Sequence, residues 1–278
     1  MKKFLTILVL VCLVACAHLS QTEEYWVTNA NNEQIYVKVD GLYNAPNQKL
    51  VFIEHGLASN LNHQAVKAAK KAFLNNGYTV ITFDARYSLG NSGNEVKFVT
   101  LNTLRADLET VIDWAKDQPF YSEPFALSGH SLGGASILAY SAAFPDKVSK
   151  LIPIAPVISG NLWERDCMKN LPDFCPTWKK NGVYEYTDPK NHKTAVIPYT
   201  VLTESKNYDA AELAPNITAQ TLLITPQNDI IVNPKDVEHL ATLLKNGQSA
   251  TVNASGHNFE TKGNQADLYQ AINAFLRL

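Results

Sequence analysis

The sequence of 278 residues has no block of basic residues, no phosphate-binding loop of the form G-x-x-x-x-G-K-[ST] and no visible internal repeat. Its formal net charge is −2, and without a basic patch a nucleic-acid partner is not expected. The missing phosphate loop argues against a nucleotide enzyme of that class. Hydrophobic residues make up 46% and charged residues 18%, a composition typical of one globular domain or one domain with an insertion.

A long apolar run that could span a membrane is also missing. Lys2 and Lys3 precede a short apolar run at residues 4–15, which matches the core of a signal peptide. The run ends in LVAC and resembles the lipobox of bacterial lipoprotein signal peptides. That resemblance implies cleavage before Cys16, lipidation of Cys16 and anchoring to a membrane of the bacterial cell envelope, on the periplasmic side if the cell is Gram-negative. The alternative is a plain secretory signal that is cleaved nearby.

Cysteine is scarce, with four in the chain. Cys12 leaves with the predicted signal peptide, and Cys16 is the predicted anchor. Cys167 and Cys175 remain in CMKNLPDFC, where they could close a small loop as a disulfide in an oxidising compartment. The alternative is two free buried thiols. No cluster of histidine or cysteine lies near them, so a metal site is not expected.

Short β-like runs alternate with helical runs along most of the chain after residue 24. YWVTN and QIYVKVD predict a hairpin around Asn31 and Asn32. Further strands are predicted for KLVFIEH, YTVITFDAR, FALSG, KLIPIAP, QTLLITP and QSATVNA, with helices between most of them and a C-terminal helix in NQADLYQAINAFLRL. This alternation predicts an α/β fold, with a mostly parallel central sheet and helices on both faces.

The alternation stops at residues 157–216, a segment rich in aromatic residues and proline. The segment is too long for a simple connection, and its aromatic content argues against disorder. We therefore predict an inserted cap at residues 157–216, a core formed by residues 16–156 and 217–278, and a signal peptide at residues 1–15.

Four predicted strands end in residues suited to chemistry. Ser131 follows FALSG, Asp229 follows QTLLITP, and His257 follows QSATVNA. His55 and Gly56 follow KLVFIE. Ligands of parallel sheets bind outside the carboxyl ends of the strands, so we expect these residues at one rim. A serine becomes a useful nucleophile when a base removes its proton.

Gly129-His130-Ser131-Leu132-Gly133 has the G-x-S-x-G pattern of a nucleophile elbow between a strand and a helix. With the order Ser131, Asp229, His257, the sequence resembles the α/β-hydrolase family over nearly all of the chain after residue 25, most specifically in GHSLGG, QNDIIV and SGHNFE. Its closest likeness within that family is to the monoacylglycerol lipase and lysophospholipase group. DARYSLGNSG departs from that group's D-x-R-G-x-G-x-S loop, because Tyr87 replaces the first glycine.

The resemblance implies a role for each residue. Ser131 would be the nucleophile, His257 the base, and Asp229 the acid that orients the imidazole. The HG of IEHGLAS resembles the oxyanion loop, so the backbone N–H groups of Leu57 and Leu132 would bind the oxyanion. Such chemistry needs no metal and no organic cofactor.

Each site residue also has an ordinary structural interpretation. Ser131 could be a turn serine, Asp229 a turn or cap residue with Asp236 as its rival, and His257 a surface histidine. Asp84 is expected to be structural. Among the remaining histidines, two are expected to support the site and three to be solvated: His55 and His130, and His63, His192 and His239.

The sequence thus predicts a serine hydrolase that cleaves carboxylic esters of apolar acyl groups, with a small-molecule or lipid ester as its partner. The cap aromatics would line the acyl site or fill the cap's own core. An aminopeptidase is a second hypothesis, because Glu164, Glu185 or Glu204 could bind a substrate amine. An acyltransferase uses the same elbow, and a non-catalytic, lipid-anchored binding module is the hypothesis from a different class.

Overall fold

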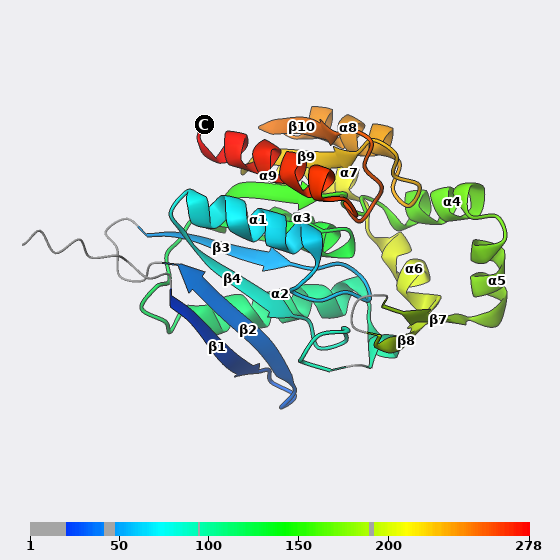
Figure 1. The fold of residues 1–278 in the computed structure, drawn as a ribbon, viewed down its shortest axis with the longest axis horizontal. Coiled ribbons are helices and arrows are strands. Elements are labelled where there is room, and N and C mark those ends of the chain that lie inside the picture. The colour runs from blue at the N-terminus through cyan, green and yellow to red at the C-terminus, as the bar shows by residue number, and fades with distance from the viewer. Residues whose placement is uncertain (1–20, 42–47, 94, 189–191) are drawn as a thin grey trace, which may run out of the picture.

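The computed structural model describes residues 21–41, 48–93, 95–188 and 192–278. Cys16 and the predicted signal peptide lie outside these residues. Within them the chain forms an eight-stranded sheet in the order β1-β2-β4-β3-β5-β6-β9-β10 (Figure 1). β2 pairs antiparallel with β1 and with β4, and all other neighbours are parallel. The predicted α/β fold with a mostly parallel sheet is confirmed.

The strands of this sheet agree with the predicted β-like runs. They span β1 Gln21–Thr28, β2 Gln34–Gly41, β3 Lys49–Glu54, β4 Tyr78–Asp84, β5 Phe125–His130, β6 Val148–Ile154, β9 Gln220–Pro226 and β10 Gly247–Val252. β4 ends two residues earlier than YTVITFDAR predicts, because the Asp84 carboxylate turns to accept the backbone N–H groups of Leu61 and Asn91.

The predicted hairpin is β1 and β2, whose register runs from Thr28 opposite Gln34 to Gln21 opposite Gly41. The turn is stabilised by Asn29, whose Oδ1 accepts the N–H groups of Asn31 and Glu33, each at 2.9 Å. Asn32 adopts φ 61°, a left-handed conformation that asparagine tolerates better than most residues. The asparagines around positions 29–32 therefore explain why this turn could be predicted from the sequence.

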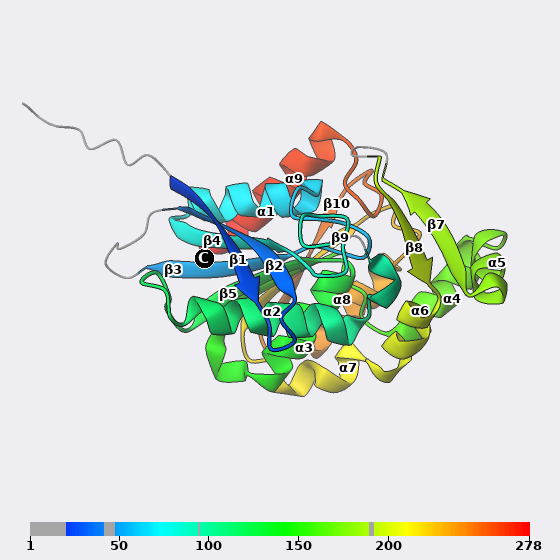
Figure 2. The same ribbon diagram turned by 90° about the horizontal axis from the view of Figure 1, so that it is seen from below.

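Helices cover both faces of the sheet (Figure 2). They span α1 Gln64–Asn75, α2 Leu101–Ala115, α3 Leu132–Ala143, α8 Pro234–Leu243 and α9 Lys262–Leu276. α1 and α9 pack together over one face, and α2, α3 and α8 lie over the other. Every residue of β4 and β5 is buried, as expected for central strands covered on both sides.

Polar side chains cap the N-termini of four helices, α1, α2, α8 and α9. His63 accepts the N–H of Ala65 at the start of α1, and Thr100 accepts that of Thr103 in α2. Asn233 and Thr261 cap α8 and α9 in the same way. Each cap satisfies a backbone donor that the first helical turn leaves without a partner. Among the described residues, no helix is long and apolar enough to cross a bilayer.

We call residues 157–216 the cap segment. Most of its described part lies beyond the end of the sheet toward which β3 points, whereas its last α-helix, at Ala210–Leu213, packs against α3 (Figures 1 and 2). The segment forms α4 Gly160–Asn170, α5 Phe174–Asn181, the antiparallel hairpin β7 Val183–Thr187 and β8 Thr194–Pro198, α6 Thr200–Glu204 and α7 Ala210–Leu213. The hairpin packs against a short 3₁₀ helix, η1, at Val96–Phe98. This mixture explains why the segment shows no strand–helix rhythm.

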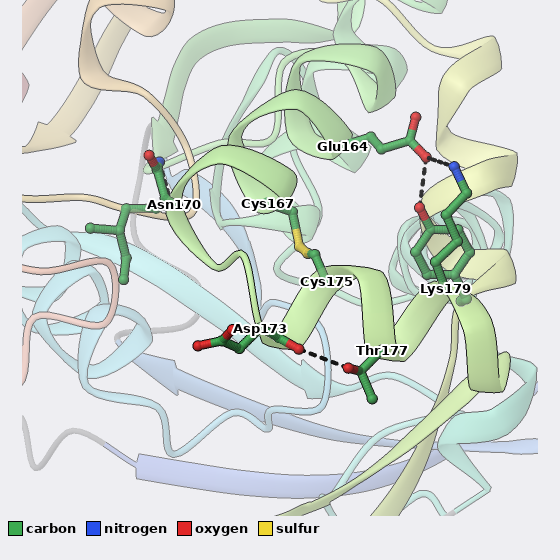
Figure 3. Close-up of a disulfide and its surroundings, with 9 residues drawn as sticks. Glu164, Cys167, Asn170, Asp173, Cys175, Thr177 and Lys179 are labelled. Atoms are coloured by element: carbon green, nitrogen blue, oxygen red, sulfur yellow. Dashed lines mark hydrogen bonds and ion pairs between the residues drawn. A yellow bond between two sulfur atoms is a disulfide. The ribbon is translucent and has the colours of Figure 1, made fainter.

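The aromatic residues of the cap segment pack mainly on one another. Trp178 is 3% exposed and contacts Phe174, Tyr184 and Tyr199, and its indole N–H donates to the Ile197 carbonyl at 3.1 Å. Close by, Cys167 of α4 and Cys175 of α5 form a disulfide (Figure 3). Trp178 therefore fills a small core within the cap segment rather than the wall of an open pocket.

Candidate active site

Ser131 stands alone between β5 and α3, in a backbone conformation that side chains rarely adopt. Its φ is 56° and its ψ is −117°, a strained geometry that typically costs on the order of 1–3 kcal/mol. The Ser131 N–H donates to the Ile154 carbonyl at 2.9 Å, and its carbonyl accepts the Val157 N–H at 3.1 Å. The last residue of β6 and the segment that follows β6 thus bind the N–H and the carbonyl of Ser131.

The two glycines of the elbow allow the backbone to approach closely on either side of Ser131. A Cβ at Gly129 would lie 2.5 Å from the Gly133 carbonyl oxygen, and one at Gly133 would lie 2.4 Å from the His55 carbonyl oxygen. Both distances are too short for any side chain. The G-x-S-x-G spacing is therefore a steric requirement of this turn.

The fold brings Ser131, His257 and Asp229 together from three loops. His257 Nε2 lies 2.9 Å from Ser131 Oγ, and His257 Nδ1 lies 2.7 Å from Asp229 Oδ2. The side chain of Asp229 is fully buried, and that of His257 is 11% exposed. This chain of hydrogen bonds links a hydroxyl, an imidazole and a carboxylate in the order needed to activate the hydroxyl.

Asp229 is held in place by the backbone of its own loop. Its Oδ1 accepts the N–H groups of Ile231 at 2.8 Å and Val232 at 3.0 Å, which leaves Oδ2 for His257. The rival acid Asp236 lies in the first turn of α8, where it forms an ion pair with Arg165 of the cap segment. Only Asp229 of these two acids contacts the histidine.

The loop that follows β3 lies directly against the elbow. A Cβ at Gly56 would come within 3.0 Å of the Ser131 Cβ, so the next residue, Leu57, follows at the immediate edge of the nucleophile. Leu132 is the first residue of α3, where backbone N–H groups have no partner within the helix. Leu132 directly follows Ser131 in the chain, and Leu57 directly follows the glycine that packs against Ser131; their N–H groups remain the predicted oxyanion donors.

His55 supports this loop through both of its ring nitrogens. Nε2 accepts the Ala85 N–H at 3.0 Å, so Nδ1 carries the hydrogen that is donated to the Gly56 carbonyl at 2.8 Å. Burial lowers the pKa of His55, although the nearby Asp84 opposes this. His55 therefore ties the glycine loop to the end of β4.

The loop after β4 contains the sequence in which Tyr87 replaces the expected glycine. The Tyr87 hydroxyl donates to Glu33 at 2.9 Å, and Arg86 forms ion pairs with Glu33 and with the buried Asp107. Burial raises the pKa of Asp107 to about 6, against the lowering effect of Arg86. The replacement thus attaches this loop to the N-terminal hairpin.

The histidines differ in part from expectation. His55 and His130 are buried within the site, and His192 and His239 are exposed. His63 was expected to be solvated, and that was wrong. It is half-buried, and its ring stacks on His130 with centroids 4.5 Å apart. No local pattern identifies this pair, because α1 begins beside the end of β5 only in the folded chain.

Comparison with known proteins places the chain in a family. The Hydrolase_4 family model, described as serine aminopeptidase, S33, matches residues 45–258. The chain belongs to this hydrolase family. A comparison with curated proteins found no match.

Solved structures share the fold of this S33 family member. Est1E from Butyrivibrio proteoclasticus with bound ferulic acid is 18% identical, with a TM-score of 0.72, over 91% of this chain and 98% of its own. Mouse α/β-hydrolase domain-containing protein 10 is 20% identical, with a TM-score of 0.69, over 92% and 98%. The Pyrococcus furiosus esterase Pf2001 is 17% identical, with a TM-score of 0.65, over 93% and 92%.

The three cap acids considered for an S33 aminopeptidase are not equivalent. Glu164 accepts from Lys179 at 3.1 Å (Figure 3). It also accepts from Tyr199 at 2.6 Å and from Lys206 at 2.5 Å. Lys206 and then Tyr199 lower the pKa of Glu164 to about 2. Glu185 and Glu204 are exposed. Glu164 is therefore already neutralised by two lysines of the cap segment.

A small, partly open pocket of this hydrolase lies between the start of α4 and the N-terminus of α8. It encloses about 190 Å³, part of which is open to solvent, and it is lined by Val157, Trp163 and Val232 together with polar residues such as Asp166 and Asp236. Val157 and Val232 are the residues whose N–H groups bind Ser131 and Asp229. Among the described residues, no group of three or more candidate ligands could hold a metal ion.

Proposed function

We propose that this protein is a carboxylic-ester hydrolase that forms an acyl-enzyme on Ser131. The observation that carries the proposal is the hydrogen-bonded chain from Ser131 Oγ through His257 to Asp229, with distances of 2.9 and 2.7 Å. This order matches the proton transfer that a serine nucleophile requires. Membership of a hydrolase family supports the same reaction class.

Each residue contributes a defined step. His257 takes the proton of Ser131 as the hydroxyl attacks the ester carbonyl, and it then gives that proton to the departing alcohol. Asp229 keeps the hydrogen on Nδ1 and stabilises the imidazolium. The N–H groups of Leu57 and Leu132 stabilise the oxyanion, and one such donor contributes about 3–4 kcal/mol. Water, activated by His257, then releases the acid.

An ester is favoured over a peptide with a free N-terminus by the state of Glu164. A carboxylate that binds a substrate ammonium needs oxygen atoms that are free to accept its hydrogen bonds. Both oxygens of Glu164 are already in use, because it is paired with Lys179 and Lys206 and accepts from Tyr199. An incoming amine would have to displace these contacts. The aminopeptidase hypothesis loses its best-placed acid, although the family description keeps it as the reaction to test against.

Apolar acyl groups are the proposed substrates, with monoacylglycerols and lysophospholipids as the lipid candidates. The cavity between α4 and α8 is lined by Val157, Trp163 and Val232, and it adjoins the residues that hold Ser131 and Asp229. Burying apolar surface in such a site stabilises the bound acyl group by roughly 25 cal/mol per Å².

A fluorophosphonate probe and a substrate series test this function. The probe should label the wild-type protein and leave Ser131→Ala unlabelled. p-Nitrophenyl esters of increasing acyl length, run beside aminoacyl p-nitroanilides, should give turnover of the esters alone. Ser131→Ala should stay folded and lose ester turnover. Labelling of Ser131→Ala, or faster cleavage of the anilides than of the esters, would contradict the proposal.

We also propose that lipidated Cys16 anchors the protein to a bacterial membrane. The support is the LVAC ending of the short apolar run. The mature native protein should begin at Cys16 and carry the mass of a lipid modification, and Cys16→Ser should release it into the soluble fraction. A mature N-terminus elsewhere without acyl mass would refute this.

A further inference from the structure

The loop that carries His257 depends on contacts outside the loop to stay in position. Residues 253–261 connect β10 to α9 and include two non-glycine residues with positive φ, Ala254 at 51° and Phe259 at 53°. Among the described residues, one backbone hydrogen bond joins two residues within this loop, from the Phe259 N–H to the Gly256 carbonyl at 3.2 Å. Such a loop gains little rigidity from its own backbone.

Two side chains from other parts of the chain, His130 and Gln64, bind consecutive carbonyl groups of this loop. His130 Nε2 lies 3.0 Å from the His257 carbonyl oxygen. The Gln64 amide donates to the next carbonyl, that of Asn258. One donor comes from the end of β5 and the other from the first turn of α1. The carbonyls of two consecutive peptide groups, His257–Asn258 and Asn258–Phe259, are therefore each bound by a side chain.

The position of the His130 ring is determined by its surroundings. Its side chain is almost fully buried, its face stacks on His63 at 4.5 Å, and the Phe259 ring meets it edge-on at 6.2 Å. A Cβ at Gly56 would lie 3.2 Å from His130 Nδ1. His130 thus touches the nucleophile elbow, the oxyanion loop and the histidine loop at once.

The protonation state of His130 follows from these contacts. A carbonyl only accepts, so Nε2 carries the hydrogen and Nδ1 is bare in the neutral ring. Burial lowers the pKa of His130 well below its ordinary value, and the neighbouring His63 and His257 lower it further. The ring is neutral at neutral pH. A second positive charge 5.1 Å from the His257 ring would oppose formation of the imidazolium during catalysis.

We infer that His130 is a positioning residue, which holds the His257 main chain through its Nε2–H and so keeps His257 within reach of both Ser131 and Asp229. Gln64 is the second donor of this clamp. The inference rests on the proposed serine-hydrolase function. The residue after His130, directly beyond the end of β5, is the proposed nucleophile Ser131. The clamp therefore connects the base to the strand end that carries the nucleophile.

Glutamine and asparagine at position 130 test the clamp as a matched pair. The amide nitrogen of Gln reaches the place of the imidazole Nε2, whereas that of Asn reaches only the place of Nδ1, beside Gly56. His130→Asn should lower kcat on the order of 100-fold, the loss typical of a catalytic group displaced by about 1 Å, with KM nearly unchanged. His130→Gln should restore most of kcat.

A separate core variant controls for stability. Phe275→Leu, in the core cluster that includes Phe259 on the α1 and α9 face, should lower the thermal unfolding midpoint without changing kcat. Gln64→Leu should cause a smaller loss than His130→Asn, because the Gln64 contact is exposed. Equal kcat values for His130→Gln and His130→Asn, or a loss in His130→Asn matched by Phe275→Leu, would overturn the inference.

A spectroscopic readout separates failure of the clamp from failure of the proposed function. The low-field NMR signal of the proton between His257 Nδ1 and Asp229 should persist in His130→Gln and weaken or vanish in His130→Asn, whatever the substrate. If the wild-type protein neither reacts with the fluorophosphonate nor cleaves esters, the proposed function is wrong, and this signal alone decides the clamp. An unchanged signal in His130→Asn would reject it.

Discussion

The rim that carries Ser131 and the cap segment beyond it are held together by different means. At the rim, hydrogen bonds to backbone groups fix the positions of the side chains. Asp229 accepts two backbone N–H groups, and His55 bridges a backbone N–H and a backbone carbonyl. In the cap segment, contacts between side chains connect the elements. They include the ion pairs of Glu164 with Lys179 and Lys206 and the disulfide between α4 and α5.

This difference suggests that the rim fixes the distances between the reacting groups, whereas the cap segment affects which substrate is preferred. Backbone groups in short loops at the ends of buried strands have little freedom to move, so they suit a site that must keep distances near 3 Å. Half-exposed ion pairs contribute little stability. Near Asp229 the cap segment meets the core through the Arg165–Asp236 ion pair and through hydrogen bonds. Asp166 accepts from the Asn233 N–H at 3.2 Å, and Asn170 donates to the Ile230 carbonyl at 2.9 Å. We expect rim substitutions to change rate and cap substitutions to change preference or stability.

The largest effect should come from Asp229→Asn. The amide would keep its oxygen toward the Ile231 and Val232 N–H groups and present its NH₂ to His257, which forces the wrong imidazole tautomer. kcat for p-nitrophenyl esters should fall on the order of 10⁴-fold. Asp236→Asn is the matched control and should leave kcat near the wild-type value. Equal losses in the two variants would mean that Asp229 has no special role.

The two tryptophans of the cap segment should then separate stability from preference. Trp178→Ala should destabilise the cap by about 3–5 kcal/mol, because Trp178 fills its core and donates to Ile197. Trp163→Ala should instead enlarge the cavity beside Asp229 and raise the ratio of kcat/KM for long acyl chains over acetyl esters. Chemical denaturation and the ester series measure these effects. Identical acyl profiles in wild type and Trp163→Ala would exclude the cavity as the acyl site.

Removal of the disulfide should have an intermediate effect that stays within the cap. The bond closes a loop with a sequence separation of 8, and a loop of this length corresponds to about 2–3 kcal/mol. The double variant Cys167→Ser and Cys175→Ser should be cleaved faster by protease in residues 157–216, while the fluorophosphonate still labels Ser131. Lost labelling at full folding would show that the triad depends on the cap.

The smallest effect on activity should come from Glu54, a buried acid at the end of β3, just before the oxyanion loop. Its burial raises its pKa well above 4.5; the Ser136 hydroxyl opposes this shift, and the nearby Asp107 adds to it. The folded state therefore holds the proton more tightly than the unfolded state. Stability from this group is present below the unfolded pKa and declines as pH rises toward the folded value, by up to about 1.4 kcal/mol per pH unit.

Glu54→Gln should remove this decline. The variant and the wild type should have similar unfolding free energies near pH 4, and the variant should become progressively more stable as pH rises above that. Urea unfolding at a series of pH values measures the difference. A constant difference across the series would show that Glu54 does not titrate between the folded and unfolded states.

The sequence alone allowed most of the fold and the three reactive residues to be predicted. Strands and helices differ in hydrophobic period, and the elbow needs glycine on both sides of Ser131 for steric reasons that any such turn shares. Asp229 and His257 could be selected because each directly follows a predicted strand. Element ends were less certain, because the side chain of Asp84, not a local propensity, decides where β4 stops.

The contacts that support the site could not be predicted in this way. His63 and Gln64 read as the start of an amphipathic helix, and His63 was expected to be solvated. Their contacts with His130 and Asn258 join residues 67 and 194 positions apart in the chain. Likewise, the sequence made Glu164 a candidate ligand for a substrate amine. In the folded chain Lys206 and Tyr199 already bind its carboxylate, which argues against that role.

The sequence by itself thus determined the order of strands and helices, the elbow and the candidate nucleophile, acid and base, because each depends on residues that are neighbours in the chain. Only the tertiary structure decided how those residues are held and what the cap aromatics do. Those outcomes depend on which distant backbone donors and side chains meet when the sheet closes, and the pairing of His130 with the His257 carbonyl exists only after β5 and the loop after β10 reach the same rim.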